Sequence, residues 1–357
     1  MATRASKNAA FGAEINEIKR EFEAQIGAED VTRVKKLSAF SRRLEAAGRL
    51  LIHFSPGPVS FSIGVLSLAA HKQLHASEIG HAVLHGAYDK LPGAEAFQSK
   101  RYRWETPIDE ETWRHGHNVL HHQYTNVVGK DPDCKYGTIR LNGNVPWKPS
   151  NRNQHLKPLL IWPSFAFSMG AHFSGMIDFY LRKPEDYDVL PDRKWVTVVD
   201  AHRKWLRKVV PYYAKEYLFF PALAGPMFWK VALGNSMAES IRSIYSAATI
   251  FTGHVGDDTA SYPAGTRASS RGEWYAMQVR SSNNFEVPGW MSVLCGGLDY
   301  QIEHHLFPKW PPNRLRQAAP RVREACERHG VQYRTAPWGT MLRRVFRQLR
   351  TLSHANA

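Results

Sequence analysis

The chain has 357 residues, of which 43% are hydrophobic and 22% charged, a composition that can bury a sizeable core and is unlike a disordered segment. Its formal net charge of +15 suggests a polyanionic neighbour, but no zinc-finger spacing, RNA-binding aromatic signature or basic zipper region supports nucleic acid. The basic residues instead flank apolar stretches, which favours a membrane surface. The three cysteines are widely spaced and odd in number, so we expect reduced thiols: Cys134, Cys295 and Cys326.

Residues 14–48 carry apolar side chains at helical spacing and are predicted to form amphipathic helices. This N-terminal arm, residues 1–49, can either lie on a membrane surface or pack on the remaining domain, and the sequence leaves both readings open. The first 25 residues lack the apolar core of a secretory signal.

Four segments without formal charge follow the arm. Residues 50–70 and 158–177 are each about long enough to cross a bilayer, whereas 217–229 and 243–256 are shorter. Any one of them can also be a buried helix of a soluble protein, and the mean hydropathy of -0.42 argues against a protein that is mostly membrane. Tryptophan, tyrosine and proline at the segment ends nevertheless favour an integral membrane protein with a large water-facing portion. Residues 312–329 and 338–352 are predicted to be two basic amphipathic helices.

Histidines gather in three compact groups. "HAVLH" places His81 and His85 four residues apart, so on a helix both point to one side. "HNVLHH" and "QIEHH" each end in an adjacent histidine pair, and one further histidine closes the apolar segment 243–256. A lone histidine is more often a core side chain than a ligand, but accident does not readily produce three such groups. The candidate metal ligands are His81, His85, His117, His121, His122, His254, His304 and His305.

The number of histidines indicates two metal ions. Imidazole binds iron, copper, zinc and nickel, so the ligand type does not identify the metal. One tetrahedral zinc uses at most four protein ligands, whereas seven or eight histidines suit two ions of higher coordination number. Adjacent helical side chains diverge by about 100°, so each member of the pair His304 and His305 can reach a different ion.

Other metal and nucleotide motifs are absent from the sequence. No His-Glu-x-x-His occurs, which argues against a zincin protease. Only Glu78 and His81 have the Glu-x-x-His spacing that soluble di-iron bundles need on two helices. No glycine-rich phosphate loop or nucleophile elbow is present either.

The stretches "HAVLH", "HNVLHHQYTNVVGKDPD" and "LDYQIEHHLFP", in this order, resemble the membrane-bound fatty acid desaturases with three histidine boxes. The similarity spans roughly residues 50–335. It implies an all-α integral membrane desaturase fold, with a cytosolic helical cap that holds a non-haem di-iron centre. The implied organisation is an N-terminal cytosolic arm (1–49), the desaturase domain (50–335) and a basic C-terminal helix and tail (336–357).

By position in the boxes, the resemblance assigns seven of these histidines as iron ligands, and His254 matches an additional ligand that many members have. Gln301 takes the place of the first histidine of the third box, a form typical of the front-end group and of bacterial relatives. Three roles for Gln301 remain open: direct ligand, orienter of a water molecule, or neighbour of the ligands. Asp299 and Glu303 are candidate acceptors for imidazole N–H groups, or else a helix cap and a solvated acid.

The chain departs from the family pattern in two ways. Residues 1–49 are too few for the fused b-type cytochrome domain of front-end members, so we expect electrons from a separate ferredoxin or b-type cytochrome and its reductase. Only 50–70 qualifies as a span before the first box, where the family usually has two. Pro56, Gly57 and Pro58 therefore mark either a re-entrant element or a reduced topology. His71 and His75 are expected to line the substrate site or to lie at the membrane interface.

The function implied by the resemblance is oxygen-dependent insertion of a double bond into the acyl chain of an acyl-CoA or acyl-lipid. It uses two non-haem iron ions, and the protein is expected in a bacterial inner membrane, among membrane lipids, with its active site on the cytosolic side. Two alternatives stay open: a lipid or alkane hydroxylase of the same di-iron superfamily, and a membrane protein that binds metal without redox chemistry. Nucleic acid is not an expected partner.

Overall fold

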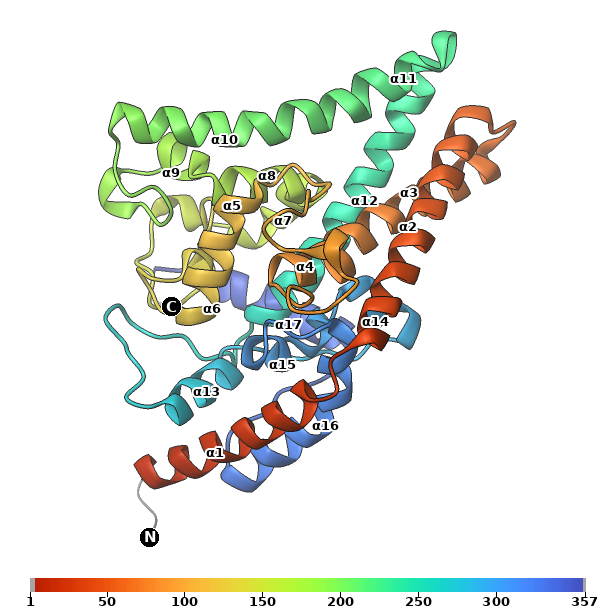
Figure 1. The fold of residues 1–357 in the computed structure, drawn as a ribbon. Helices are drawn as coiled ribbons and strands as arrows, with labels where there is room; N and C mark the ends of the chain where they lie inside the picture. Colours follow the sequence, from red (N-terminus) through yellow and green to blue (C-terminus); the bar gives the residue numbers. More distant parts are fainter. Residues whose placement is uncertain (1–3, 356–357) are drawn as a thin grey trace.

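The computed structural model describes residues 4–355, which are mostly helical, as the sequence predicts. The single sheet in this part of the chain pairs β1 (Lys135–Tyr136) with β2 (Ile139–Arg140) in antiparallel register. Two helical hairpins project together from a broader layer of shorter helices, which we call the cap (Figure 1). The histidine groups lie in the cap, at the base of the hairpins.

The N-terminal arm packs on the cap. α1 (Arg4–Glu23) lies beside α13 (Arg271–Arg280) and α16 (Pro312–His329), at the end of the molecule away from the hairpin tips (Figure 1). The side chains that α1 buries recur every three or four residues: Phe11, Ile15, Ile18 and Phe22. Of the two readings left open by the sequence, the structure therefore shows the packed helix for α1.

The first hairpin consists of α2 (Ala28–Phe54) and α3 (Pro58–Leu74). The chain reverses between them at Pro56, Gly57 and Pro58, the residues that the sequence marks as a break, so residues 50–70 are divided between two helices and do not form one span. A proline at the first position of α3 explains the break, because its ring fixes φ and lacks an N–H for the preceding helix. The two helices approach closely at Gly48, where an added Cβ would lie 2.8 Å from the backbone nitrogen of Leu68.

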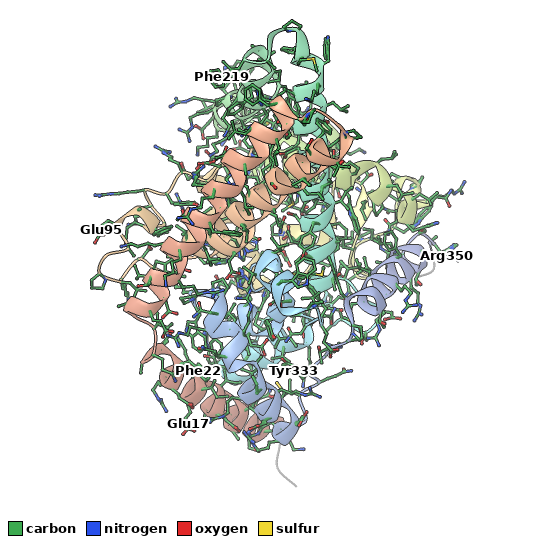
Figure 2. All side chains as sticks on the ribbon, turned by 90° about the vertical axis from the view of Figure 1, so that its right-hand side faces the viewer. Glu17, Phe22, Glu95, Phe219, Tyr333 and Arg350 are labelled. Carbon is green, nitrogen blue, oxygen red and sulfur yellow. The ribbon has the colours of Figure 1, made fainter. Side chains whose placement is uncertain are left out.

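The second hairpin combines α10 (Trp195–Ala214), α11 (Phe220–Ala222) and α12 (Phe228–His254). The predicted segment 217–229 forms its tip, and Figure 2 shows Phe219 at this extreme end of the molecule. The predicted segment 243–256 is the buried last part of α12, together with the two residues that follow it. Both segments are thus parts of one hairpin.

The predicted segment 158–177 is not one helix. It divides among α7 (Pro158–Ile161), α8 (Phe165–Phe173) and the start of α9 (Met176–Leu181). Gly175, with φ of +80°, separates the last two of these helices, because few side chains tolerate that backbone conformation. Within residues 4–355, every helix is either too short or too polar to cross a membrane.

Apart from two short segments of the second hairpin, Lys215–Phe219 and Gly225–Met227, the remaining elements belong to the cap. Its other α-helices are α4 (Ala82–Leu84), α5 (Glu110–Trp113), α6 (His122–Tyr124), α14 (Gly289–Cys295), α15 (Gln301–Leu306) and α17 (Trp338–Thr351). π-helical segments cover His75–His81, Arg114–His121 and Lys215–Phe219. Short 3-10 turns cover Glu95–Phe97, Pro132–Cys134, Pro149–Asn151, Gln154–Leu156, Trp162–Ser164, Pro184–Asp186, Gly225–Met227 and Leu298–Tyr300. The predicted helix 312–329 is confirmed as α16, and α17 ends one residue before its prediction.

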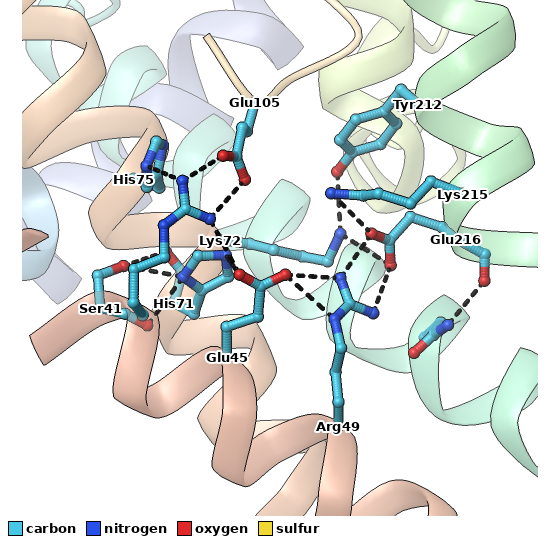
Figure 3. Close-up of polar contacts among 12 residues, drawn as sticks. Ser41, Glu45, Arg49, His71, Lys72, His75, Glu105, Tyr212, Lys215 and Glu216 are labelled. Carbon is cyan, nitrogen blue, oxygen red and sulfur yellow. Dashed lines mark hydrogen bonds and ion pairs between the residues drawn. The ribbon is translucent and has the colours of Figure 1, made fainter. Parts of the chain in front are cut away.

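Charged side chains join the two hairpins in their buried interior (Figure 3). Lys72 Nζ lies 3.3 Å from Glu216 and 3.1 Å from Glu239, and Arg49 lies 2.9 Å from Glu216. The Tyr212 hydroxyl donates to Glu239 over 2.6 Å. We call the following six residues the ionic network: Glu45, Arg49, Lys72, Glu216, Glu239 and Arg242. Its three cations balance its three carboxylates.

His71 and His75 lie at the margin of the ionic network and not in the histidine cluster. His71 Nδ1 lies 2.9 Å from the Ser41 hydroxyl, and His75 Nε2 lies 3.2 Å from the Arg42 guanidinium (Figure 3). Neither residue lines the cavity described below, so a role in lining the substrate site finds no support in the structure.

Candidate metal centre

The first two histidine boxes lie on helices that widen locally. The stretch His75–His81 and the stretch Arg114–His121 are π-helical, and each passes directly into a single α-helical turn. π-helical turns are rare and occur mostly at functional sites. The third box lies on α15, which follows two glycines in the left-handed region. An added Cβ at the first of these, Gly296, would lie 2.6 Å from the Ser77 backbone, so glycine permits α15 to approach the first box.

The structure brings all eight predicted histidines together in one cluster. The ring nitrogens of seven of them form two groups, and His122 lies between these groups. The first group consists of His81, His85, His117 and His304. Within it, His81 Nε2 lies 3.2 Å from His85 Nε2 and 3.3 Å from His117 Nε2. The ligand atoms of this group all lie within 4.8 Å of one another.

The second group is made of single histidines from three distant parts of the chain. His121 Nε2 lies 3.2 Å from His254 Nε2, and His305 Nε2 lies 3.0 Å from the same atom. The adjacent pair of the third box is therefore split, with His304 in the first group and His305 in the second, as the divergence of helical neighbours predicts. His122 lies between the groups, with its ring stacked on that of His305 at 4.3 Å between centroids.

Hydrogen bonds on the far side of each ring fix the tautomers of the second group. His121 Nδ1 donates to Asp131 over 3.0 Å, and His305 Nδ1 donates to the Gln278 amide oxygen over 3.0 Å. His254 Nδ1 faces the Ser281 backbone carbonyl at 3.3 Å. Because Nδ1 carries the proton in a neutral ring, Nε2 of His254 and of His305 presents a lone pair, and the Nε2 atoms of all three rings point at one another.

Burial makes this cluster unfavourable without a cation. Burial lowers the pKa of His81 to about 3, so its ring stays neutral. Burial acts in the same direction on His121, but the Asp131 carboxylate outweighs it and raises the pKa of His121 to about 9. Lone pairs that converge in a dry interior repel one another unless a proton or a metal lies between them. Two nitrogens bound at right angles to one ion, each about 2.1 Å away, are about 3 Å apart, which matches the observed spacing. The residues therefore fit a pair of imidazole-bound metal ions.

The two predicted carboxylate acceptors do not contact the imidazoles. Glu303 accepts hydrogen bonds from Asn284 and Tyr333, and burial raises its pKa to about 8. Asp299 accepts a hydrogen bond from the Ser292 hydroxyl. The prediction that Asp299 and Glu303 accept hydrogen bonds from imidazole N–H groups is therefore wrong. Asp131, in the "DPD" that follows the second box, accepts such a hydrogen bond from His121.

Gln301 reaches the second group of histidines. Its amide nitrogen lies 2.7 Å from His254 Nε2 and 3.3 Å from His305 Nε2. His115, which precedes His117 by two residues, is by contrast exposed.

A cavity of about 80 Å³ lies against both groups of histidines. Its walls are mostly apolar: Trp104, Ile108, Phe165, Met169 and Ile250. It follows α12 from His254 to Arg242, a distance of about 18 Å at the helical rise per residue. Ser77, Ser246 and Arg242 line its far end, where the ionic network begins. An extended apolar chain in this cavity would pass the histidines and end at a charged wall.

The comparisons with known proteins agree with this site. The family model for fatty acid desaturases matches residues 56–337, most of the chain. The NADPH-dependent stearoyl-CoA 9-desaturase of Mycobacterium tuberculosis is 31% identical over 348 residues, covering 96% of this chain and 79% of that protein. The sn-1 linoleoyl-lipid 6-desaturase of a Synechocystis species is 26% identical over 298 residues, covering 78% of this chain and 77% of its own length. The acyl-lipid (7-3)-desaturase of Rebecca salina is 32% identical over 244 residues, covering 63% of this chain and 49% of that protein.

A family match over most of the chain, together with histidine boxes that converge beside an apolar cavity, identifies the kind of enzyme. The chain belongs to the fatty acid desaturase family, the oxidoreductases that introduce double bonds into acyl chains.

Proposed function

We propose that this desaturase holds two non-haem iron ions in its histidine cluster. The observation that carries the proposal is the convergence of nitrogens from all three boxes and α12 into two adjoining groups. The proposed ligands are His81, His85, His117, His121, His122, His254, His304 and His305. Asp131 and Gln278 would hold two of these rings in the tautomer that presents Nε2 to the metal.

The proposed reaction converts two neighbouring methylenes of an acyl chain into a double bond. One dioxygen, two electrons and two protons are consumed, and two water molecules form, so atoms and electrons balance. Iron bound in the cluster would supply the activation of dioxygen and the removal of the two hydrogens. The protein positions the chain: Trp104, Phe165 and Met169 exclude water from the cavity and hold the reacting carbons beside the histidines.

We propose further that the two hairpins insert into a membrane, with the cap on the cytosolic side. Large apolar side chains are exposed along both hairpins, where a soluble protein would lose free energy by solvating them. They include Leu50, Phe54, Val59, Ile63, Leu66, Leu218, Phe219, Leu223, Trp229 and Leu233. The charged residues of these helices pair with one another inside, which is how membrane proteins place ionisable groups. A bacterial inner membrane is the proposed location.

The electron donor and the acyl carrier are also proposals. Electrons would come from a separate ferredoxin or b-type cytochrome and its reductase. The Mycobacterium tuberculosis relative is named for NADPH and stearoyl-CoA, and the Synechocystis relative for a lipid-bound chain. We propose that the substrate of this enzyme is an acyl-CoA or an acyl-lipid.

Expression in a host with a defined fatty acid profile tests the reaction. With iron and a donor system supplied, chromatography of the fatty acid methyl esters should show a new unsaturated product, absent from a strain that carries His254→Ala. A product that gains oxygen would instead show a hydroxylase. Stoichiometric binding of zinc or nickel without any dioxygen consumption would show a metal-binding protein without redox activity.

A further inference from the structure

We propose that Gln301 binds one of the two ions through its amide oxygen, so that the two metal sites are chemically unequal. The inference rests on the proposed di-iron function and concerns the composition of its second site. The first group of ring nitrogens contains imidazoles only, whereas the second would combine three imidazoles with one amide oxygen.

The position of the amide supports a direct contact. Gln301 is buried on α15, and its amide nitrogen lies within hydrogen-bonding distance of two members of the second group, at 2.7 Å from His254 and 3.3 Å from His305. These distances are as short as those between the imidazoles themselves. The amide therefore occupies a ligand position in the cluster and is not separated from it by another side chain.

The proton positions decide which end of the amide faces a bound ion. His254 and His305 carry their protons on Nδ1, because these atoms face a carbonyl and an amide oxygen. In the metal-free protein the Gln301 NH2 group can donate to their Nε2 lone pairs. Once those lone pairs bind a cation, an NH2 group beside the ion is repelled and has no acceptor there.

A half-turn of the amide removes this conflict. Rotation about the bond between Cγ and Cδ exchanges two groups of nearly equal size and brings the oxygen to the ion. In the present orientation the oxygen is buried and lacks a hydrogen-bond donor among residues 4–355, a condition that is unfavourable for a buried carbonyl oxygen. The carbonyl oxygen thus gives up no hydrogen bond when it turns toward the metal.

A glycine on the facing helix makes room for the Gln301 side chain. Gly253 immediately precedes His254 on α12, and a Cβ there would lie 2.9 Å from Gln301 Cγ and 3.0 Å from Cδ. Any larger residue would push the glutamine away from His254. This close approach is an independent observation, because it concerns the carbon atoms of the side chain and not the polar end.

Mössbauer spectroscopy of the purified protein loaded with ⁵⁷Fe tests the proposal. The wild-type chain should bind two irons and give two quadrupole doublets of equal area. Gln301→Leu, which removes the oxygen, should weaken one iron by at least about tenfold and reduce one doublet selectively. Gln301→Glu keeps an oxygen donor, so it should retain both irons and shift only one doublet. Gly253→Ala should resemble Gln301→Leu.

The iron content and the spectra of the wild type and the variants decide whether the inference stands. Two irons in a single doublet in the wild type, or an unchanged spectrum and iron content in Gln301→Leu, would overturn the inference. Gln154→Leu is the matched control, because it removes a fully buried glutamine that hydrogen-bonds only backbone groups away from the cluster. It should lower the thermal unfolding temperature and leave both doublets in place. A wild-type protein with two unequal irons but no desaturase activity would remove the proposed function and leave this inference standing.

Discussion

The histidine cluster and the ionic network are two buried polar regions at opposite ends of one cavity, and they differ in how they are satisfied. In the ionic network, Lys72 lies between Glu216 and Glu239, and the three cations offset the three carboxylates. In the histidine cluster, the Nε2 atoms of His121 and His305 lie 3.2 and 3.0 Å from Nε2 of His254, and in the part of the chain that the structure describes no carboxylate pairs with these three atoms to offset a charge. The chain alone completes the first region, whereas the second needs an added cation. The first is therefore structural, and the second is the proposed metal centre.

Removal of a cluster histidine should have the largest effect. His254→Ala takes away the nitrogen that both His121 and His305 approach, so one iron should be lost from the folded protein. Desaturase activity should then fall below detection, because both irons are required by the proposed mechanism. Iron per chain by atomic absorption and product by gas chromatography measure the two effects.

His115→Ala is the control for this variant. The residue lies two positions before His117 in the same box but is exposed. It should bind two irons and keep its activity. Equal loss in the two variants would show that the second box tolerates no change and would contradict a specific role for the cluster.

Removal of a charge from the ionic network should destabilise the fold without emptying the metal sites. Lys72→Met leaves Glu216 and Glu239 with one cation fewer in a buried setting, which should cost about 3–5 kcal/mol of unfolding free energy. Denaturation of the detergent-solubilised protein measures the loss, and iron per folded chain should stay at the wild-type value.

Arg323→Met provides the exposed counterpart, since its ion pair with Glu327 is more than half solvent-accessible on both sides. The expected loss there is below about 1 kcal/mol. Similar losses in the two variants would mean that the buried charges contribute no more than surface ones.

The same contrast explains what the sequence predicted well and what it did not. The boxes are local patterns, so the convergence of their histidines and the split of His304 from His305 followed from spacing and helical geometry, whereas His254 was matched through the family resemblance. The limits of the apolar helices did not follow from the sequence, because the end of a charge-free run does not mark the end of a helix. Lys72 lies just beyond the predicted segment 50–70, and Arg242 lies just before 243–256. Each nevertheless belongs to the same helix as the apolar residues beside it, and its charge is paired in the interior. Pairing across two hairpins cannot be read from one segment.

The partners of the ligands were missed for a related reason. Gln278 comes from α13, and Gly253 matters only because α15 passes beside it. Asp131 was within the quoted sequence of the second box, but nothing in its spacing distinguishes it from Asp133. Only the folded chain shows that Asp131 is the nearer of the two to His121 Nδ1, at 3.0 Å against 3.5 Å for Asp133.

Loss of the carboxylate behind His121 should weaken one metal site moderately. Asp131→Asn keeps the shape of the side chain but removes the negative charge that orients the ring and favours its Nδ1 proton. Iron affinity at the second group should fall about 10–100-fold, measured by competition with a chelator. Asp257→Asn, which alters an exposed ion pair with Arg347, should leave the affinity unchanged. An unchanged affinity in Asp131→Asn would show that the hydrogen bond does not support the ligand.

Narrowing of the cavity at its charged end should give the smallest and most selective effect. Ser246 lines the cavity beside Arg242, so Ser246→Leu should shorten the space for the methyl end of the acyl chain. The ionic network behind it cannot retreat, because displacing a buried ion pair costs several kcal/mol. One methylene more or less in an apolar pocket changes kcat/KM by roughly tenfold or more. The activity toward the longest accepted chain should therefore fall by about tenfold relative to the activity toward a chain two carbons shorter.

Ile244→Phe adds bulk two residues earlier on α12, where the side chain is 42% exposed and faces away from the cavity. Its product profile should match the wild type, as gas chromatography of mixed-chain incubations would show. If Ser246→Leu instead lowers the activity toward all chain lengths equally, the methyl end does not reach the charged wall, and the ionic network acts on stability alone. A selective loss of the longest chains would show that the same buried charges that join the hairpins also limit the length of the substrate.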